Sequence, residues 1–423
     1  MAAYTVTKLI GAGQAYTTLA TWEADAPANL TTAEKSACTT FLTGTFTVAM
    51  TLTFVGSGAT GVVLETDSTG PGTGTYMVYG ITTGNPAASD VITGTGGTPP
   101  TCVLTSGTAD NVGVVWQGKI NASTDGFSGT ANLLTMAGST ASATSYKELT
   151  TKAGASFIDN IGAGALKYNE SNGCFIKITS GSSIQTVVMT ENYSRVSKVQ
   201  TTNAGTYGAL GFIVTGTGNQ ITQVISQLTA GSTGGRPIKL DVSTSTLLTN
   251  SLLIANVNVA NVGLECSYST TPEIDNCTIV RPSNITVQGT GIVRVGAATP
   301  LIKNCVVLGF TTPFTTSGFS ASSSNNAAET GATFPGTGGG NVTAVNDTTT
   351  FTQPSAASAP NWRTPTGSVL IAAGSSGGNI PTTDILGTTV PAYAIGAFNT
   401  GLAVIANAPA GYFDSELNIK AWF

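Results

Sequence analysis

The sequence contains no histidine and few charged side chains, and these two shortages exclude many kinds of active site. Without histidine, Ser-His and Cys-His catalytic pairs cannot form, and most zinc and iron sites lose their usual ligand. Charged residues make up only 9% of the 423 residues, and the formal net charge is -5. The sequence has no run of Lys or Arg. We therefore expect no binding of nucleic acid, which depends on clustered basic groups.

Long apolar segments and metal-binding motifs are also missing. The longest apolar runs are far shorter than the ~20 residues that a membrane-spanning helix needs, so we expect no membrane insertion. The six cysteines form no C-x-x-C pair, and phosphate-loop, dinucleotide and EF-hand patterns are absent, so we expect no metal and no cofactor. Residues 1–7 lack the charged start and apolar core of a secretory signal, from which we expect synthesis in a cytoplasm.

The residues that are abundant indicate an ordered β protein. Thr, Ser, Gly and Ala dominate, and Gly alone numbers 52, a composition that disordered chains share. However, hydrophobic residues reach 41%, and β-branched residues recur at strand spacing throughout. Disordered segments lack this pattern. The composition therefore predicts a β-rich fold with little helix.

Residues 211–310 repeat a unit of two short strands joined by a polar bend. The second strands of the four units align, in steps of 27, 26 and 28 residues, at Ile221, Leu248, Ile274 and Ile302. The first strands are centred on Val214, Leu240, Leu264 and Val293. We expect both sets of side chains to fill an interior. A period this regular, and too short for a βαβ unit, predicts a solenoid whose coils bury their apolar stripe by stacking.

Stacked coils would place equivalent residues in columns. Asn250, Asn276 and Asn304 share the bend, and we expect them to form a structural ladder in which side-chain amides hydrogen-bond from coil to coil. A ligand-binding role for this column is the alternative. Cys277 and Cys305 also occupy equivalent positions, and we expect them to stack in the interior as small apolar residues. A disulfide or a reactive thiol is the alternative for this pair.

Four regions are predicted along the chain. Residues 1–45 are expected to be an N-terminal cap, with a helix at 16–24 that begins at a capping Thr, and a second helical piece at 32–35. Residues 46–320 are expected to be the β-helix, with loops projecting from irregular turns between 66 and 150. Residues 321–399 are expected to be a closing segment with loops, and residues 400–423 an apolar tail.

The tail carries nine large apolar side chains, whose exposure to water would be unfavourable. We expect it to make a subunit contact in a homotrimer. The contact residues are expected to be Leu402, Val404, Tyr412, Phe413, Trp422 and Phe423. A tail that folds back onto its own coil is the alternative.

The repeated Ile-x-Asn-Cys strand resembles right-handed parallel β-helix proteins of the pectin-lyase-like group. Residues 367–398 are also similar to the closing segment of those proteins, with a Gly-Ser stretch, an Asp-hydrophobic-x-Gly turn at Asp384 and an Ile-Gly-Ala-aromatic end. The chain departs from that pattern at Thr388 and Thr389, where a basic residue is common, and at Asn399, where an acid is common. The resemblance implies an all-β fold: a right-handed parallel β-helix with a short N-terminal helical cap and an irregular C-terminal extension.

Enzymes that share this architecture use carboxylates, often with calcium and sometimes with an arginine, on the outer face of one strand column. The alignment places Thr215, Asp241, Glu265 and Arg294 in such a column. If adjacent, the two acids could raise one carboxyl pKa or share a cation beside the arginine. In the interpretation that we favour, the column is a solvated ladder in which Arg294 offsets the two acids.

Two functions remain from these observations. The first, which we favour, is a non-enzymatic structural protein of a tailed-bacteriophage virion, namely a capsid decoration protein on the head surface, with a tail fibre or spike role next. Its partners would be other virion proteins, above all the major capsid protein. The second is a tailspike depolymerase or another polysaccharide-acting lyase or hydrolase that uses Asp241, Glu265 and Arg294. A bacterial adhesin, a third possibility, is weakened by the missing export signal.

Overall fold

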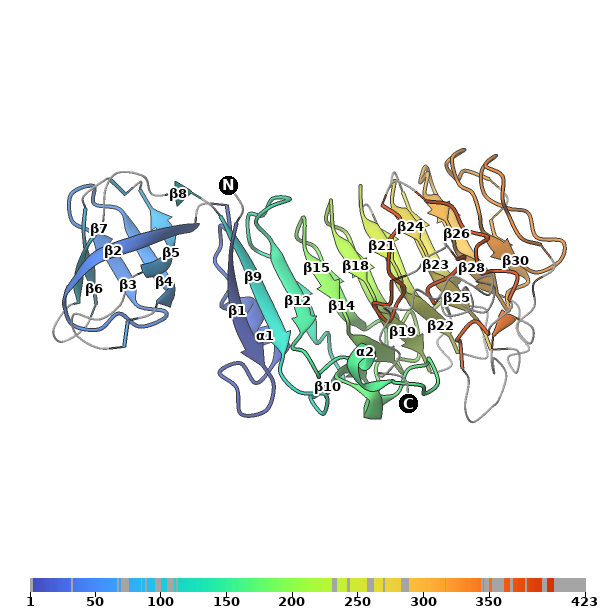
Figure 1. The fold of residues 1–423 in the computed structure, drawn as a ribbon, viewed down its shortest axis with the longest axis horizontal. Helices are drawn as coiled ribbons and strands as arrows, with labels where there is room; N and C mark the ends of the chain where they lie inside the picture. The colour runs from blue at the N-terminus through green and yellow to red at the C-terminus, as the bar shows by residue number, and fades with distance from the viewer. Residues whose placement is uncertain are drawn as a thin grey trace, which may run out of the picture.

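The protein is a right-handed parallel β-helix with very little helix, as the sequence predicts (Figure 1). The computed structural model describes the chain apart from residues 1, 2, 32, 67, 70–75, 85, 88, 89, 96–99, 105–109, 112, 230–233, 242, 243, 257–261, 269, 270, 283–288, 316, 344, 346–349, 352–360, 366, 367, 377, 378, 390–393 and 399–423; at 33–42, 76, 102–104, 110 and 111 it describes the backbone alone. The helices in this part are α1 (Leu19–Ala24), α2 (Phe157–Asn160) and the 3-10 turn η1 (Glu170–Asn172).

Three parallel sheets form the sides of the coil. Sheet 1 contains, in order, β1 (Tyr4–Ile10), β9 (Val114–Ile120), β12 (Lys147–Thr151), β15 (Arg195–Ser197), β18 (Gln220–Thr222), β21 (Leu247–Thr249), β24 (Glu273–Asp275) and β27 (Leu301–Lys303). Sheet 2 contains β10 (Gly126–Gly129), β13 (Phe175–Ile178), β16 (Gln200–Asn203), β19 (Ile225–Leu228), β22 (Leu252–Ala255), β25 (Thr278–Val280), β28 (Val306–Leu308) and β30 (Ala327–Ala328). Sheet 3 contains β11 (Leu134–Met136), β14 (Gln185–Met189), β17 (Leu210–Val214), β20 (Arg236–Asp241), β23 (Val262–Ser267), β26 (Thr290–Val295) and β29 (Thr312–Phe314).

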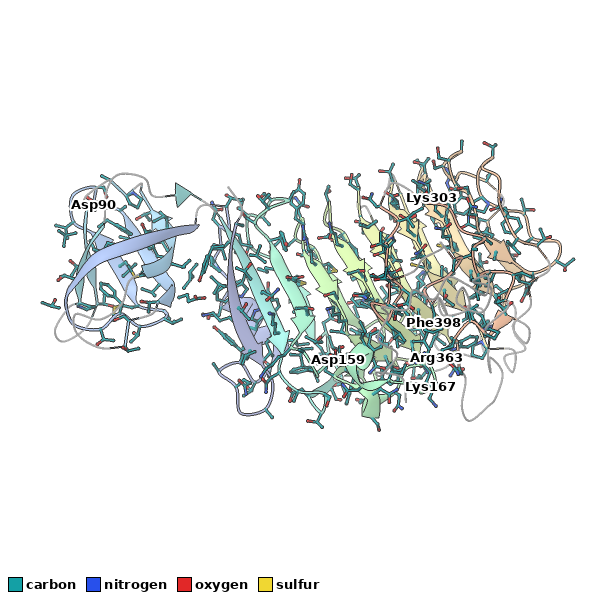
Figure 2. The ribbon with its side chains drawn as sticks, in the orientation of Figure 1. Asp90, Asp159, Lys167, Lys303, Arg363 and Phe398 are labelled. Atoms are coloured by element: carbon teal, nitrogen blue, oxygen red, sulfur yellow. The ribbon has the colours of Figure 1, made fainter. Side chains whose placement is uncertain are left out.

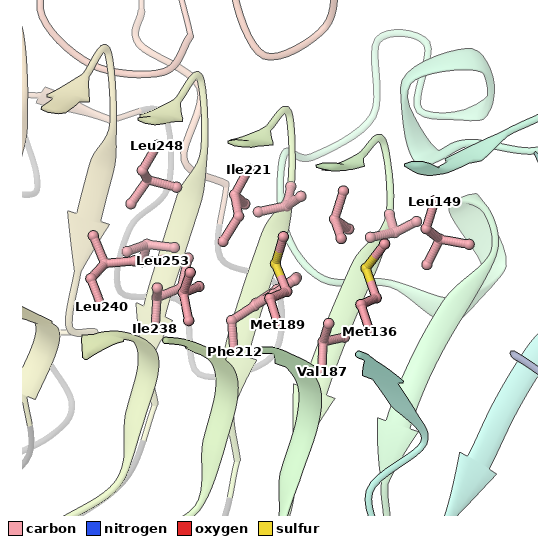
Figure 3. Packing of buried hydrophobic residues seen from close by; sticks show 14 of the residues in the cluster. Met136, Leu149, Val187, Met189, Phe212, Ile221, Ile238, Leu240, Leu248 and Leu253 are labelled. Atoms are coloured by element: carbon pink, nitrogen blue, oxygen red, sulfur yellow. The ribbon is translucent and has the colours of Figure 1, made fainter. Parts of the chain in front are cut away.

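The predicted register of the second strands is correct. Ile221, Leu248, Ile274 and Ile302 pair in sequence across sheet 1, and each is 0% exposed. Figure 3 shows two of them pointing into the same interior as side chains from the other two sheets. Each predicted second strand is in fact two strands, because a residue with positive φ bends the chain between sheets 1 and 2. Gln223 (φ 54°) makes this bend between β18 and β19.

The predicted register of the first strands is partly wrong. Val214 pairs with Leu240 as expected, but Leu240 then pairs with Cys266 rather than with Leu264. Leu264 is nonetheless interior, in the row of Ile238 and Ile292. Val293 pairs with Glu265 and is half-buried, so it does not belong to the core. The alternation of side chains along a strand explains this error, because a shift of one residue moves a side chain to the other face.

Helix α1 covers the N-terminal end of the coil, whereas β1, which was expected to belong to the cap, is a strand of sheet 1. The Thr18 hydroxyl caps the helix by accepting a hydrogen bond from the Thr21 amide, and Leu19 and Trp22 are buried against the first coil. The second helical piece predicted at 32–35 is wrong. Residues 33–35 belong to strand β2 (Ala33–Thr43), and residue 32 lies outside the described residues.

Residues 33–111 form an insert domain between β1 and β9, which corrects the expectation that the β-helix begins at residue 46. The insert is antiparallel and contains β2, β3 (Thr51–Phe54), β4 (Thr60–Thr66), β5 (Tyr76–Thr83), β6 (Val91–Gly94), β7 (Thr101–Leu104) and β8 (Asp110–Asn111). The sheet closes into a ring, because β2 pairs with β5 as well as with β7. Phe46, Phe54 and Tyr79 are the largest side chains of its separate core.

The insert packs against the first coil. Leu64 and Val78 belong to the same apolar cluster as Val6 and Trp22 of the β-helix. Lys8 Nζ donates to the Leu64 carbonyl at 2.9 Å. The insert therefore helps α1 to cover the first coil.

The C-terminal end of the coil is closed by aromatic side chains. Phe319 and Phe334 lie against Phe314 of β29, with ring centroids 6.3 and 5.8 Å away. After Phe319 the chain continues the coil irregularly, through β30 and a bridge from Ala327 to Val342. Residues 321–342 of the predicted closing segment thus extend the solenoid.

The rest of the closing segment does not lie at the end of the coil. We call its described residues from 361 to 398 the strap. In Figure 1 the strap is the red segment that runs back along the side of the coils. Leu370, Ile385, Ile395 and Phe398 pack with the outward-facing residues of sheet 2, such as Leu252. Sheet 2 is therefore apolar on both faces, and the strap covers the outer one.

Candidate functional site

The structure does not assemble the predicted column of Thr215, Asp241, Glu265 and Arg294. Lys239 pairs with Glu265, and Asp241 pairs with Ser267, so the two acids stand two positions apart along neighbouring strands. Arg294 pairs with Cys266. Successive residues of a strand point to opposite faces, so Arg294 lies in the inward-facing row and not beside Glu265. Thr215 follows the end of β17, where its amide donates to the Met189 carbonyl.

Two basic residues that the sequence analysis did not single out hold the acids. Lys239 Nζ lies 2.8 Å from Asp241 Oδ2 and 3.6 Å from Glu265 Oε1. Arg236 Nε contacts Glu265 Oε2. Ser267 Oγ donates a hydrogen bond to Glu265 Oε1. Both carboxylate oxygens of Glu265 therefore have a partner, and each acid has a cation.

The electrostatics of Glu265 do not suit an acid catalyst. Burial alone would raise the pKa of Glu265, but the Ser267 hydroxyl and the charges of Arg236 and Lys239 hold it below its usual value. A glycoside hydrolase needs one carboxyl group whose pKa is raised so that it can protonate the leaving group. This cluster instead resembles an ion network that ties β20 to β23.

Lys239 left a signal in the sequence. The steps of 26 and 28 residues that separate Leu248, Ile274 and Ile302 also separate Leu240, Cys266 and Arg294. If the steps of the second strands are also applied to the first strands, Lys239 falls opposite Glu265. The repeat of the second strands was thus the better guide.

The asparagine column has a role that differs from the predicted one. Asn250, Asn276 and Asn304 have φ between 47° and 52°, a conformation that Asn tolerates better than most residues. The backbone amide of each residue makes the coil-to-coil hydrogen bond, for example from Asn250 N to the Asp275 carbonyl at 3.2 Å. The side-chain amides of two of them bind the strap instead. Asn250 Nδ2 donates to the Thr383 carbonyl at 2.8 Å, and Asn304 Nδ2 donates to the Ser375 carbonyl at 3.0 Å.

Neighbouring coils extend this docking strip. Asn325 Nδ2 donates to the Ala373 carbonyl, and Gln223 Nε2 donates to the Asp384 carbonyl. The bends of successive coils therefore hold successive strap residues. The sequence contained the column, but nothing in it indicated that the partner was a segment so much later in the chain.

Cys277 and Cys305 both lie in the interior, with 0% exposure and free thiols. Each thiol hydrogen-bonds a carbonyl, for Cys305 that of Ile274 at 3.4 Å. Burial raises the pKa of the Cys305 thiol well above its usual value, which keeps it protonated and unreactive.

A buried ion triad near the N-terminal end was not predicted from the sequence. Lys147 of β12 is 1% exposed, and its Nζ lies 2.7 Å from Glu23 Oε1 of α1 and 2.9 Å from Glu191 Oε2. Burial raises the pKa of Glu191, although Lys147 and the Ser139 amide oppose the shift. The triad joins the capping helix to two coils. Such long-range pairs have no signature in the spacing of residues.

The surface of the described residues includes two hollows whose volumes fit a small ligand. One, of about 420 Å³, lies beside this triad and is lined by residues 138–141 and 190–192. The other, of about 470 Å³, is lined by residues 25–29 of the cap and by Val62, Leu64 and residues 80–82 of the insert. Within the described part of the chain, no three His, Cys, Asp or Glu side chains gather closely enough to hold a metal ion.

The predicted subunit contact lies outside the described residues. This applies to Leu402, Val404, Tyr412, Phe413, Trp422 and Phe423. Among the helices that the structure describes, none has the length and apolar character needed to cross a membrane. No protein-family model and no curated protein matches the chain.

Proposed function

We propose that the chain is a non-enzymatic structural protein of a tailed-bacteriophage virion, a capsid decoration protein of the head surface. The observation that carries this proposal is the closure of the solenoid on three sides: α1 and the insert cover the first coil, three phenylalanines cover the last, and the strap covers sheet 2. A stiff element with protected edges suits a particle surface, because open strand edges would pair with other chains.

The character of the acidic cluster also supports a structural role. Glu265 has two basic partners and a hydroxyl donor, and Arg294 faces away from it. A polysaccharide-acting enzyme would instead need a carboxyl group that is poised to give up a proton. The acidic balance of the whole chain, with a net charge of -5, disfavours contacts with packaged nucleic acid.

The partners that we propose are other virion proteins, above all the major capsid protein, and two further copies of this chain. Residues 400–423 supply the apolar side chains for that trimer. Burying one such side chain contributes ~1.5 to 3 kcal/mol, which can offset the entropy lost on association. Deleting residues 400–423 should convert a trimer to a monomer in light scattering. A trimer that survives the deletion would assign the contact elsewhere.

Purified particles provide the test of the location. Antibodies raised against this chain should label intact phage heads in electron micrographs, and the chain should copurify with the capsids. Labelling of tails would move the proposal to a fibre or spike. Two results together would favour the enzyme. The chain would be absent from purified particles, and it would release reducing ends from a polysaccharide in an activity that the Asp241→Asn, Glu265→Gln double variant lacks.

A further inference from the structure

The strap crosses the corner between sheets 1 and 2 one coil after another. Its backbone contacts run from Ala373, at Asn325, through Ser375, at Asn304, to Thr383, at Asn250. Between the last two points, Asn379 Nδ2 donates to Glu273 Oε2 at 2.6 Å. The strap therefore passes over β24, the strand that lies between β21 and β27.

Asp275 lies at this crossing point. It is the last residue of β24, and it stands in a row of outward-facing residues between Thr249 of β21 and Lys303 of β27. Its side chain is 0% exposed, and neither carboxylate oxygen has a hydrogen-bond partner. An ionised carboxylate in such a place is costly, because burial removes its water without supplying donors.

The residues around Asp275 do not compensate for its charge. On its own strand the nearest titratable group is Glu273, which is also acidic, and β21 contributes only Thr249 and Leu247. On β27, Lys303 is half-buried and forms no ion pair with Asp275, although its charge favours the ionised form. Strap residues 375–383 contain no charged side chain, and the next residue, Asp384, is acidic.

We propose that Asp275 makes closure of the strap proton-dependent: the neutral carboxylic acid is accommodated beneath strap residues 373–376 and 379–384, and the ionised carboxylate loosens them. The neighbouring coils show what the position otherwise holds. Thr249 Oγ1 donates to Thr222 Oγ1 at 2.9 Å in the same row, so the two preceding coils hold a neutral hydroxyl at this position. Asp275 ends this row of hydroxyls, and Lys303 follows it on the next coil.

The direction of the effect follows from proton linkage. Burial, together with the negative charge of Glu273 and the hydrogen bond that the protonated acid can donate to Glu273, raises the pKa of Asp275 to about 8, from 3.8 for an exposed group. Between these two values the closed strap holds one proton more than the opened strap. Opening therefore becomes easier as the pH rises from about 4 to about 8, by up to roughly tenfold per pH unit.

Hydrogen exchange of a peptide that covers residues 368–389 tests the proposal. At each pH the wild type is compared with Asp275→Asn, so that the intrinsic pH dependence of exchange cancels. The ratio of wild-type to variant exchange should rise steadily between pH 5 and pH 8. Peptides from β22 and β23 should show no such rise, because the opening is confined to the strap.

A second variant controls for effects of the amide group that Asp275→Asn introduces. Asp275→Thr extends the row of hydroxyls formed by Thr222 and Thr249, and it should behave like Asp275→Asn. A ratio that stays constant from pH 5 to pH 8 against both variants would overturn the proposal. The same holds if β22 and β23 exchange in step with the strap, because the whole coil would then be opening.

Discussion

The β-helix and the insert bury their apolar side chains in different ways. Each coil of the β-helix has an interior that is open at both ends, so it depends on the coils beside it and on covers at the two ends of the stack. The insert closes on itself, because β2 pairs with both β5 and β7 around the core of Phe46, Phe54 and Tyr79. The difference shows where a substitution should unfold each region. The β-helix should be sensitive at its interior rows and at its covers, whereas the insert should be sensitive only in its own core.

The largest expected effect comes from breaking an interior row of the β-helix. Leu264→Asp places a charge at a position with 0% exposure, between Ile238 and Ile292 of the adjacent coils. No partner is available there, so the variant should not fold to a soluble protein. Val295→Asp is the matched control, because Val295 lies on the neighbouring coil of the same sheet and is 42% exposed. Equal yields of both variants in soluble form would contradict the assigned interior.

The sequence predicted the β-helix because stacking imposes a common length on each coil. The row of Ile221, Leu248, Ile274 and Ile302 repeats at nearly constant spacing, next to bend residues of one type. The first strands follow the same steps of 26 and 28 residues, from Leu240 to Cys266 and to Arg294, but Cys266 and Arg294 are not the strongly apolar residues of their strands. Leu264 and Val293 were matched to Leu240 by apolar character alone, which does not distinguish an inward position from its neighbour.

The insert could not be predicted in this way. Its strands pair across long stretches of sequence, as between Ala33 and Gly80 or between Phe41 and Cys102, and no period marks those pairs. The alternating strands at 46–64 were recognised, but not the fact that they turn back on each other. The strap had the same difficulty, because the asparagine column indicates a bend but not the segment that binds to it.

The second largest effect is expected at the cover of the first coil. Lys147→Met leaves Glu23 and Glu191 without their shared cation, and Glu191 is almost fully buried. Removing one partner of a buried ion pair costs about 3 to 5 kcal/mol. Denaturant unfolding should report this loss. Lys177→Met is the control, because its pair with Glu170 is exposed and contributes under ~1 kcal/mol. Similar losses in the two variants would mean that the triad is not buried in solution.

Removing the insert tests the comparison directly. Leu30 and Val114 lie on either side of it and are joined by a 2.8 Å backbone hydrogen bond, so a short Gly-Ser linker can replace residues 33–111. The shortened chain should still fold. Its free energy of unfolding should fall by about 3 kcal/mol, because the apolar side chains of the first coil that Leu64 and Val78 cover become exposed to water. The separate segment 31–113 should fold on its own. A shortened chain that aggregates would show that the insert is an essential cover, as α1 is.

The smallest effect is expected at the acidic cluster on the outside of sheet 3. Asp241→Asn combined with Glu265→Gln leaves Arg236 and Lys239 without counter-charges, so the variant should lose about 2 kcal/mol near neutral pH. The pKa of Glu265 lies below its usual value of 4.5, so the stability that it contributes is present above pH 4.5 and is lost as the pH falls below it. The wild type should therefore approach the variant in stability on acidification, whereas at neutral pH the two should differ. A variant more stable than the wild type would mean that the two acids repel each other, as they would if they stood side by side, and that the register of β20 and β23 in solution differs from the one described.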